Sequence, residues 1–105
     1  RRRRRLPAAT SAATPLPLML YNLPGRTARN MEVSTTARLA EIPNIVATKE
    51  ASGDLMQIAR TRNATANDFQ IYSGNDGDTL PMLTLGAVGV VSVISHLAGR
   101  QMRQM

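Results

Sequence analysis

Short apolar runs alternate with amphipathic segments from residue 18 to the end of the chain. The apolar runs predict strands over residues 18–22, 45–48, 69–72 and 88–94. The segments between and after them predict helices over residues 34–41, 54–63, 79–85 and 98–105. The last strand is β-branched and almost continuously apolar, which is typical of a strand buried on both faces.

Capping residues support the predicted helices. Asp54 or Ser52 can cap the second helix, and Gly86 is well placed for the left-handed residue just beyond the third. Asp76 and Asp78 precede the third helix, where a carboxylate is stabilised by the positive helix terminus. We interpret these two carboxylates as caps and not as a metal pair.

The β-α alternation predicts an α/β fold with a parallel sheet and right-handed crossovers. Two architectures are compatible with it, a doubly wound open sheet and part of an eight-stranded α/β barrel. A complete barrel needs ~250 residues, so this chain could hold about four of its β-α units. Polar and glycine residues follow the predicted strands, where barrel active sites are built.

Residues 1–17 differ in composition from the rest of the chain and predict a disordered or non-native tail. They combine Arg1–Arg5 with Ala, Ser, Thr and three prolines, and they contain no acidic residue. Such a composition also resembles an organelle transit peptide. The domain organisation predicted is therefore a tail over residues 1–17 and a folded part over residues 18–105.

The net charge of +6 belongs mainly to that tail, because five of the thirteen basic residues are Arg1–Arg5. Beyond them, basic and acidic residues nearly balance, and aromatic residues for base stacking are scarce. We therefore expect no nucleic-acid partner. No apolar run approaches the ~20 residues of a membrane span, so no membrane partner is expected either.

Residue types missing from the sequence exclude several chemistries. The chain has no cysteine, which rules out disulfides, thiolate metal sites and a cysteine nucleophile within it. Its one histidine, His96, excludes a multi-histidine metal site and is interpreted as a loop or capping residue.

Lys49 is the only lysine, and it stands at the end of an apolar run. A lysine differs from arginine in that burial can make its amine neutral and nucleophilic, which suits a Schiff base. Tyr21 and Arg26 also end or follow a predicted strand, so all three side chains could share one rim. An amine, a phenol and a guanidinium together suit chemistry on a keto acid, although a surface lysine and a packing tyrosine remain the alternative.

Three blocks make the sequence similar to a known family. They are Tyr-Asn-Leu-Pro-Gly-Arg-Thr at 21–27, Ile-Pro-Asn-Ile-Val-Ala-Thr-Lys-Glu-Ala-Ser-Gly-Asp at 42–54 and Tyr-Ser-Gly-Asn-Asp at 72–76. In combination they resemble the 4-hydroxy-tetrahydrodipicolinate (dihydrodipicolinate) synthases of the pyruvate-dependent class I aldolase superfamily. The resemblance runs from about residue 16 to residue 105.

The resemblance implies a C-terminal half-barrel fragment, a partial TIM (β/α)8 barrel containing strands 5–8 of the family barrel. It implies a lyase that condenses pyruvate with aspartate semialdehyde through a lysine Schiff base, in diaminopimelate and lysine biosynthesis. It further implies no cofactor, no metal, a homo-oligomer (a tetramer in the family) and a cytoplasmic location, or a plastid in a eukaryote.

Carried over by position, the resemblance assigns catalytic roles to Lys49, as imine former, and to Tyr21, as proton relay. Arg26 would bind the carboxylate of aspartate semialdehyde, and the backbone of Gly74 and Val91 would line the pyruvate pocket. The Arg-Thr pair favours this synthase over sialic acid lyases and keto-sugar-acid aldolases.

Three positions depart from the family pattern without removing a catalytic group: Ala28 replaces a common glycine, Thr48 an apolar residue and Asn75 an acidic one. The family's first four strands, with a pyruvate-binding threonine pair and an intersubunit tyrosine, have no counterpart here. We therefore expect the chain alone to be inactive and poorly folded, or to self-associate. A non-catalytic half-barrel association module is the alternative function.

Overall fold

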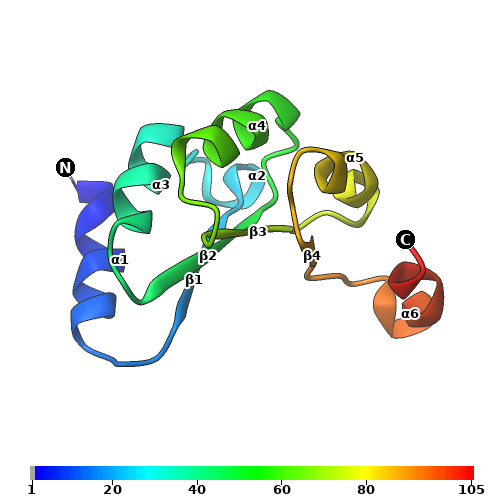
Figure 1. The fold of residues 1–105 in the computed structure, drawn as a ribbon, viewed down its shortest axis with the longest axis horizontal. Coiled ribbons are helices and arrows are strands. Elements are labelled where there is room, and N and C mark those ends of the chain that lie inside the picture. The colour runs from blue at the N-terminus through cyan, green and yellow to red at the C-terminus, as the bar shows by residue number, and fades with distance from the viewer. Residues whose placement is uncertain (1) are drawn as a thin grey trace.

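The fold is known from a computed structural model, which describes residues 2–105 and contains one four-stranded sheet (Figure 1). All neighbouring strands are parallel, and their order in the sheet is the order of the sequence. The strands are β1 (Leu18–Asn22), β2 (Ile45–Glu50), β3 (Gln70–Ser73) and β4 (Gly89–Val90).

In residues 2–105, six helices and one short 3-10 turn connect or flank these strands. They are α1 (Arg2–Ala12), α2 (Pro24–Thr27), α3 (Val33–Ala40), α4 (Leu55–Ala64), η1 (Asp76–Asp78), α5 (Thr79–Thr84) and α6 (Ser95–Arg103). Figure 1 shows α3, α4 and α5 on one face of the sheet, while the opposite face carries no helical layer. A doubly wound sheet has helices on both faces, whereas sequential parallel strands with helices outside are the arrangement of an α/β barrel.

The core lies between the sheet and its helices, in two apolar clusters. One contains Leu20, Leu39, Ile45 and Phe69, and the other contains Ile58, Ile71, Met82 and Ala87. Burial of each Leu or Ile side chain contributes about 1.5–3 kcal/mol relative to an exposed side chain. The apolar runs of the sequence therefore fix which face of each strand the helices cover.

Two predicted helix signals are confirmed by the structure. The Asp54 carboxylate accepts a hydrogen bond from the Gln57 backbone N–H at 3.0 Å, which caps α4. Gly86 has φ +94° just beyond α5, in the region that favours glycine.

The fourth strand was predicted wrongly in both length and burial. Instead of extending over residues 88–94, β4 is only Gly89–Val90, and the apolar side chains around it are exposed, Val93 by 76%. In the described part of the chain β4 pairs with β3 alone. Continuous burial of a strand requires neighbours on both sides, and here β4 has one among the described residues. The β-branched run alone therefore did not produce a longer strand. α6 also starts earlier than expected, at Ser95, and is kinked at Ala98.

The N-terminal segment also differs from the expected disorder, because residues 2–12 form α1, which packs against α3. The Asn44 side chain donates hydrogen bonds to the carbonyls of Ser11 at 3.1 Å, Thr14 at 3.0 Å and Leu16 at 3.3 Å. Alanine has the highest helix propensity, and the Asn44 amide satisfies the Ser11 carbonyl in the last turn of the helix and two carbonyls just beyond its end. Residue 1 lies outside the described residues.

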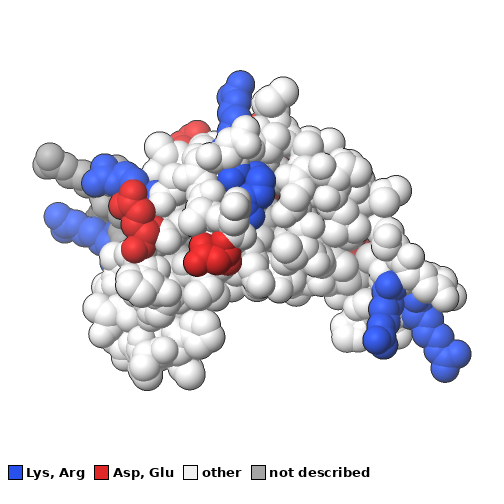
Figure 2. All heavy atoms as spheres, viewed as in Figure 1, with Lys and Arg blue, Asp and Glu red and all other residues white. Residues whose placement is uncertain are grey.

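Charged side chains are unevenly distributed over the face seen in Figure 2. Basic groups project from both ends of the molecule and also lie at its top and centre, and acidic groups lie beside the basic ones at the left and near the centre. No single broad basic surface crosses this face. None of the helices in the described residues is long and apolar enough to cross a membrane.

Candidate active site

Lys49 and Tyr21 lie side by side near the carboxyl ends of β2 and β1. They are partners in the parallel register of the two strands, so both side chains project from the same face of the sheet. Tyr21 is 49% exposed, while its neighbours Leu20 and Asn22 are buried toward the helices. The pair therefore occupies the face that carries no helical layer.

The Lys49 amine contacts the ring of Tyr21. Its Nζ lies 4.0 Å from the ring centroid, within the range of a cation–π contact. This contact holds the amine beside the phenol without burying either group fully. The structure thus brings together the predicted nucleophile and the predicted proton relay.

Gly74 makes room for the Lys49 side chain. A Cβ atom at this position would lie 2.9 Å from the Ala51 Cβ and 3.1 Å from the Lys49 Cε. The Gly74 N–H also donates to the Glu50 carbonyl at 2.7 Å, which ties the loop after β3 to the end of β2. The predicted pocket residue therefore lies directly against Lys49, and its lack of a side chain is a steric requirement.

Arg26 and Val91 lie after β1 and β4, and the described residues give neither side chain a hydrogen bond to Lys49. Arg26 is exposed on α2, directly after β1, and its side chain forms no hydrogen bond with another described residue. Val91 follows β4, is 42% exposed and donates its N–H to the Ser73 carbonyl at 2.9 Å. The backbones of both residues are held in place, while their side chains are exposed.

The loop that carries Arg26 is closed by a left-handed residue. Ala28 has φ +53° and donates its N–H to the Pro24 carbonyl at 2.9 Å. The Thr27 hydroxyl donates to the carbonyls of Leu23 at 3.1 Å and Arg29 at 3.0 Å. This conformation is one that glycine adopts more readily than alanine.

Glu50, the residue after Lys49, is a buried carboxylate that the sequence analysis did not single out. It is 1% exposed on the helix side of the sheet and accepts a hydrogen bond from Asn22 Nδ2 at 3.1 Å. Burial raises the pKa of Glu50 from 4.5 to about 6, opposed by hydrogen bonds from Asn22 and Ser52 and assisted by the charge of Asp54. In the sequence Glu50 lies two residues beyond the predicted strand, so its position directly after Lys49 was the available signal.

We predicted that Asp76 caps the third helix, but its carboxylate does not cap α5. Its carboxylate instead accepts hydrogen bonds from the Ser92 hydroxyl and from the backbone N–H groups of Val93 at 3.3 Å and Ile94 at 3.1 Å. These donors lower the pKa of Asp76. Asp78 occupies the N-cap position of α5 without a capping hydrogen bond from its side chain. Asp76 therefore anchors the segment after β4, a contact distant in sequence.

Tyr72 is a second aromatic neighbour of Lys49. It is the register partner of Lys49 on β3, opposite to Tyr21 on β1. Its hydroxyl donates to Gln70 Oε1 at 3.0 Å, and its ring lies close to Gly89, where a Cβ would be 3.3 Å away. The Tyr72 phenol is therefore engaged on its own strand.

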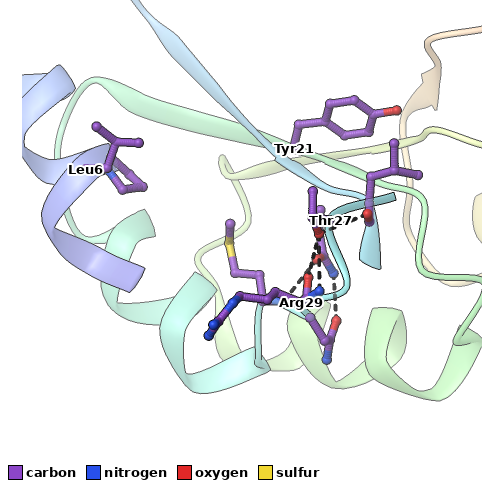
Figure 3. Close-up of a pocket in the computed structure, with 9 residues that line it drawn as sticks. Leu6, Tyr21, Thr27 and Arg29 are labelled. Atoms are coloured by element: carbon purple, nitrogen blue, oxygen red, sulfur yellow. Dashed lines mark hydrogen bonds between the residues drawn. The ribbon is translucent and has the colours of Figure 1, made fainter. Parts of the chain in front are cut away.

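A hollow of about 390 Å³ lies between α1 and β1 (Figure 3). Leu6 of α1 and Tyr21 of β1 line it, together with Thr27 and Arg29 of the loop after α2, whereas Lys49 does not. Tyr21 is therefore shared between this hollow and the contact with Lys49. No cluster of three or more His, Cys, Asp or Glu side chains able to hold a metal ion occurs among the described residues.

Known proteins resemble this chain in sequence and in structure. The sequence profile of the Dihydrodipicolinate synthetase family matches residues 8–105, which extends the similarity into α1. A 4-hydroxy-tetrahydrodipicolinate synthase of a Cyanothece species is 58% identical over 98 residues, covering 93% of this chain and 33% of the relative.

Two solved structures resemble this chain in three dimensions as well. Dihydrodipicolinate synthase from Cyanidioschyzon merolae, solved with lysine bound, has a TM-score of 0.90 at 56% identity over 92% of this chain and 33% of its own. The chloride-inhibited enzyme from Acinetobacter baumannii, complexed with pyruvate, has a TM-score of 0.87 at 41% identity over 91% and 33%.

The match extends over nearly all of this chain but about a third of the length of its relatives. The architecture is accordingly part of a TIM barrel, with about four β-α units, as the sequence predicted. Similarity in sequence, in fold and in family profile agrees, and the chain belongs to the dihydrodipicolinate synthetase family.

Proposed function

We propose that this chain carries the imine-forming part of a lyase that condenses pyruvate with aspartate semialdehyde, on the route to diaminopimelate and lysine. The contact between Lys49 and Tyr21 is the observation that carries the proposal, because it joins an amine and a phenol at the carboxyl end of a barrel strand. The pyruvate complex of the Acinetobacter relative supports the choice of keto acid.

In the proposed reaction, Lys49 Nζ attacks the keto carbon of pyruvate. The resulting carbinolamine loses water to become an imine, and Tyr21 transfers the protons that this step requires. Loss of a proton from the methyl carbon gives an enamine, which forms a carbon–carbon bond with the aldehyde carbon of aspartate semialdehyde. Hydrolysis of the imine then frees Lys49.

The other predicted residues fit supporting roles in this scheme. Arg26, exposed after β1, would bind the carboxylate of the aldehyde substrate with its guanidinium fork. The backbone of Gly74 and Val91 would line the space for pyruvate, and the missing side chain of Gly74 leaves that space open. The chain spans about a third of its relatives, so the remaining barrel residues would complete the site.

Reductive trapping tests the proposal directly. The full chain is incubated with pyruvate and sodium borohydride, digested and analysed by mass spectrometry. Because Lys49 is the only lysine, a reduced pyruvate adduct must fall on Lys49 or on the terminal amine, and peptide mapping separates the two. We expect the adduct on Lys49, its loss in Lys49→Arg, and its slower formation in Tyr21→Phe.

Matched variants make the trapping result specific. Tyr72→Phe removes the other phenol beside Lys49 and should leave the adduct rate unchanged, because that hydroxyl is bound to Gln70. An adduct confined to the terminal amine contradicts the proposal. Turnover with aspartate semialdehyde is measured in the same samples, and we expect none from this chain alone.

A non-catalytic association module is the second candidate function. The helix-free face and the β4 region expose large apolar side chains, among them Met19 at 44%, Val88 at 54% and Val91 at 42%. β1 and β4 are edge strands of the sheet in the described residues, and free edges favour pairing between chains. A monodisperse oligomer in sedimentation experiments, with no pyruvate adduct, would favour this function over the enzyme.

A further inference from the structure

A buried polar network lies on the helix side of the sheet, on the face opposite to Lys49. Asn22 is at its centre and is 2% exposed. Its Nδ2 donates to Glu50 Oε2 at 3.1 Å and to Asn30 Oδ1 at 2.9 Å, and its Oδ1 accepts from the Met31 N–H at 2.9 Å. One amide therefore contacts β2 and the far end of the loop after β1.

The network continues from this loop to α4. Asn30 Nδ2 donates to Gln57 Oε1 at 2.7 Å, and Gln57 Nε2 returns hydrogen bonds to Asn30 Oδ1 at 3.2 Å and the Met31 carbonyl at 3.3 Å. Gln57 is itself buried on α4. The loop end is thus bound on two sides, by β1 and by α4.

The geometry of this network links two residues of the proposed site. The loop that carries Arg26 leaves β1 at Asn22 and is bound again to the same Asn22 side chain at Met31. Glu50 follows Lys49 directly on β2, and its carboxylate is the second contact of the Asn22 amide. A shift of Glu50 or Asn22 would therefore change where the loop lies relative to Lys49.

We propose that Asn22 and Glu50 are positioning residues, which fix the loop bearing Arg26 relative to the strand bearing Lys49. This inference rests on the proposed function, in which Arg26 binds the aldehyde substrate and Lys49 binds pyruvate. Neither residue touches the reacting atoms, since both lie on the opposite face of the sheet. Their effect is on orientation, and a displacement of about 1 Å can cost about a hundredfold in rate.

The burial of the pair supports a role in geometry over one in stability. Packing apolar side chains in place of a buried charge is often neutral or stabilising, so a buried carboxylate is weak support for stability alone. A satisfied polar network, in contrast, has fixed partners and directions. Here those directions specify one arrangement of the strand end, the loop and α4.

Hydrogen exchange in the full chain tests the link without requiring activity. In Asn22→Ala and Glu50→Ala we expect the Met31 amide to exchange at least tenfold faster than in the parent, while amides within β2 change little. Glu50→Gln should restore protection, because its amide oxygen can still accept from Asn22. If Asn22→Ala does not fold, Asn30→Ala replaces it, because the position of Asn30 is only half-buried.

The control variant is Thr79→Ala, which truncates a buried hydroxyl bonded to the Asn75 carbonyl at 3.2 Å, away from the loop. It should leave Met31 exchange unchanged. Equal acceleration in Thr79→Ala, unchanged Met31 exchange in both alanine variants, or no rescue by Glu50→Gln would overturn the inference.

A second measurement separates this inference from the proposed function. The pyruvate trapping reaction is repeated on the variants, and the rate at which the Lys49 adduct forms is compared with the parent. In Asn22→Ala we expect an unchanged adduct rate beside the faster Met31 exchange, because Lys49 and Tyr21 lie on the opposite face of the sheet. Loss of the adduct in Asn22→Ala would overturn the positioning role, whereas a missing adduct in the parent chain would refute the proposed function and leave hydrogen exchange to decide the link.

Discussion

Replacement of Glu50 by glutamine should stabilise the chain at neutral pH and remove part of its pH dependence. The pKa of Glu50 is raised from 4.5 to about 6 in the folded chain, mainly by burial. The folded state therefore holds a proton more tightly than the unfolded state. The stability that this proton contributes is complete below pH 4.5 and is lost as the pH rises through about 6.

The size of the effect follows from the difference between the two pKa values. The two pKa values differ by about 1.5, and each pKa unit is worth 1.36 kcal/mol. Full ionisation of Glu50 therefore costs roughly 2 kcal/mol. Glutamine stays neutral and can still accept the hydrogen bond from Asn22, so it avoids this cost. The free energy of unfolding of Glu50→Gln minus that of the parent should increase by roughly 2 kcal/mol between pH 4 and pH 7.

Urea unfolding followed by far-ultraviolet circular dichroism is the suitable assay, because the chain contains no tryptophan. Parent and variant are measured in the same buffers, so titration of other carboxylates cancels in the difference. Glu41→Gln makes the same substitution at an exposed carboxylate and is the matched control. A difference that stays flat from pH 4 to pH 7, or that falls with pH, would refute the reasoning.

Three further predictions concern backbone and loop positions. Gly74→Ala should abolish the Lys49 adduct and destabilise the chain by about 1–3 kcal/mol, because its Cβ would collide with neighbours at 2.9–3.1 Å; trapping and urea unfolding measure the two effects. Ala28→Gly should raise the free energy of unfolding by about 0.5–1 kcal/mol, since relief of the strain at φ +53° exceeds the entropy cost of glycine; an unchanged or lower urea midpoint would contradict this. Asp76→Asn should accelerate amide exchange at Ile94, because an amide group loses acceptor capacity for the N–H groups there; unaltered exchange would show that the carboxylate is dispensable.

Much of the local structure follows from the sequence because its causes are local. Apolar runs specify strands, and Asp54 and Gly86 specify helix ends through their own hydrogen bond or backbone angle. The parallel sheet follows from β-α alternation, whereas the choice of a partial barrel over a doubly wound sheet came from the resemblance to the family. Lys49 and Tyr21 could be paired in advance because each stands at the end of a predicted parallel strand.

Contacts between distant segments depend on packing and were not predictable in this way. Asp76 looked like a helix cap, but the backbone N–H groups of Val93 and Ile94 compete for its carboxylate in the folded chain. β4 is short because burial depends on having neighbours on both sides, which a β-branched run cannot supply by itself.

The order of the four strands, the family and the residues able to carry imine chemistry could be read from the sequence, whereas α1 and α2 could not. How those residues are held depends on the folded chain: the amine against the Tyr21 ring, the gap at Gly74 and the Asn22–Glu50 link beneath the sheet. Propensity and hydrophobic pattern act over neighbouring residues. Contacts such as the 3.1 Å bond from Asn22 to Glu50 join positions 28 apart, and they exist only once the strands have paired.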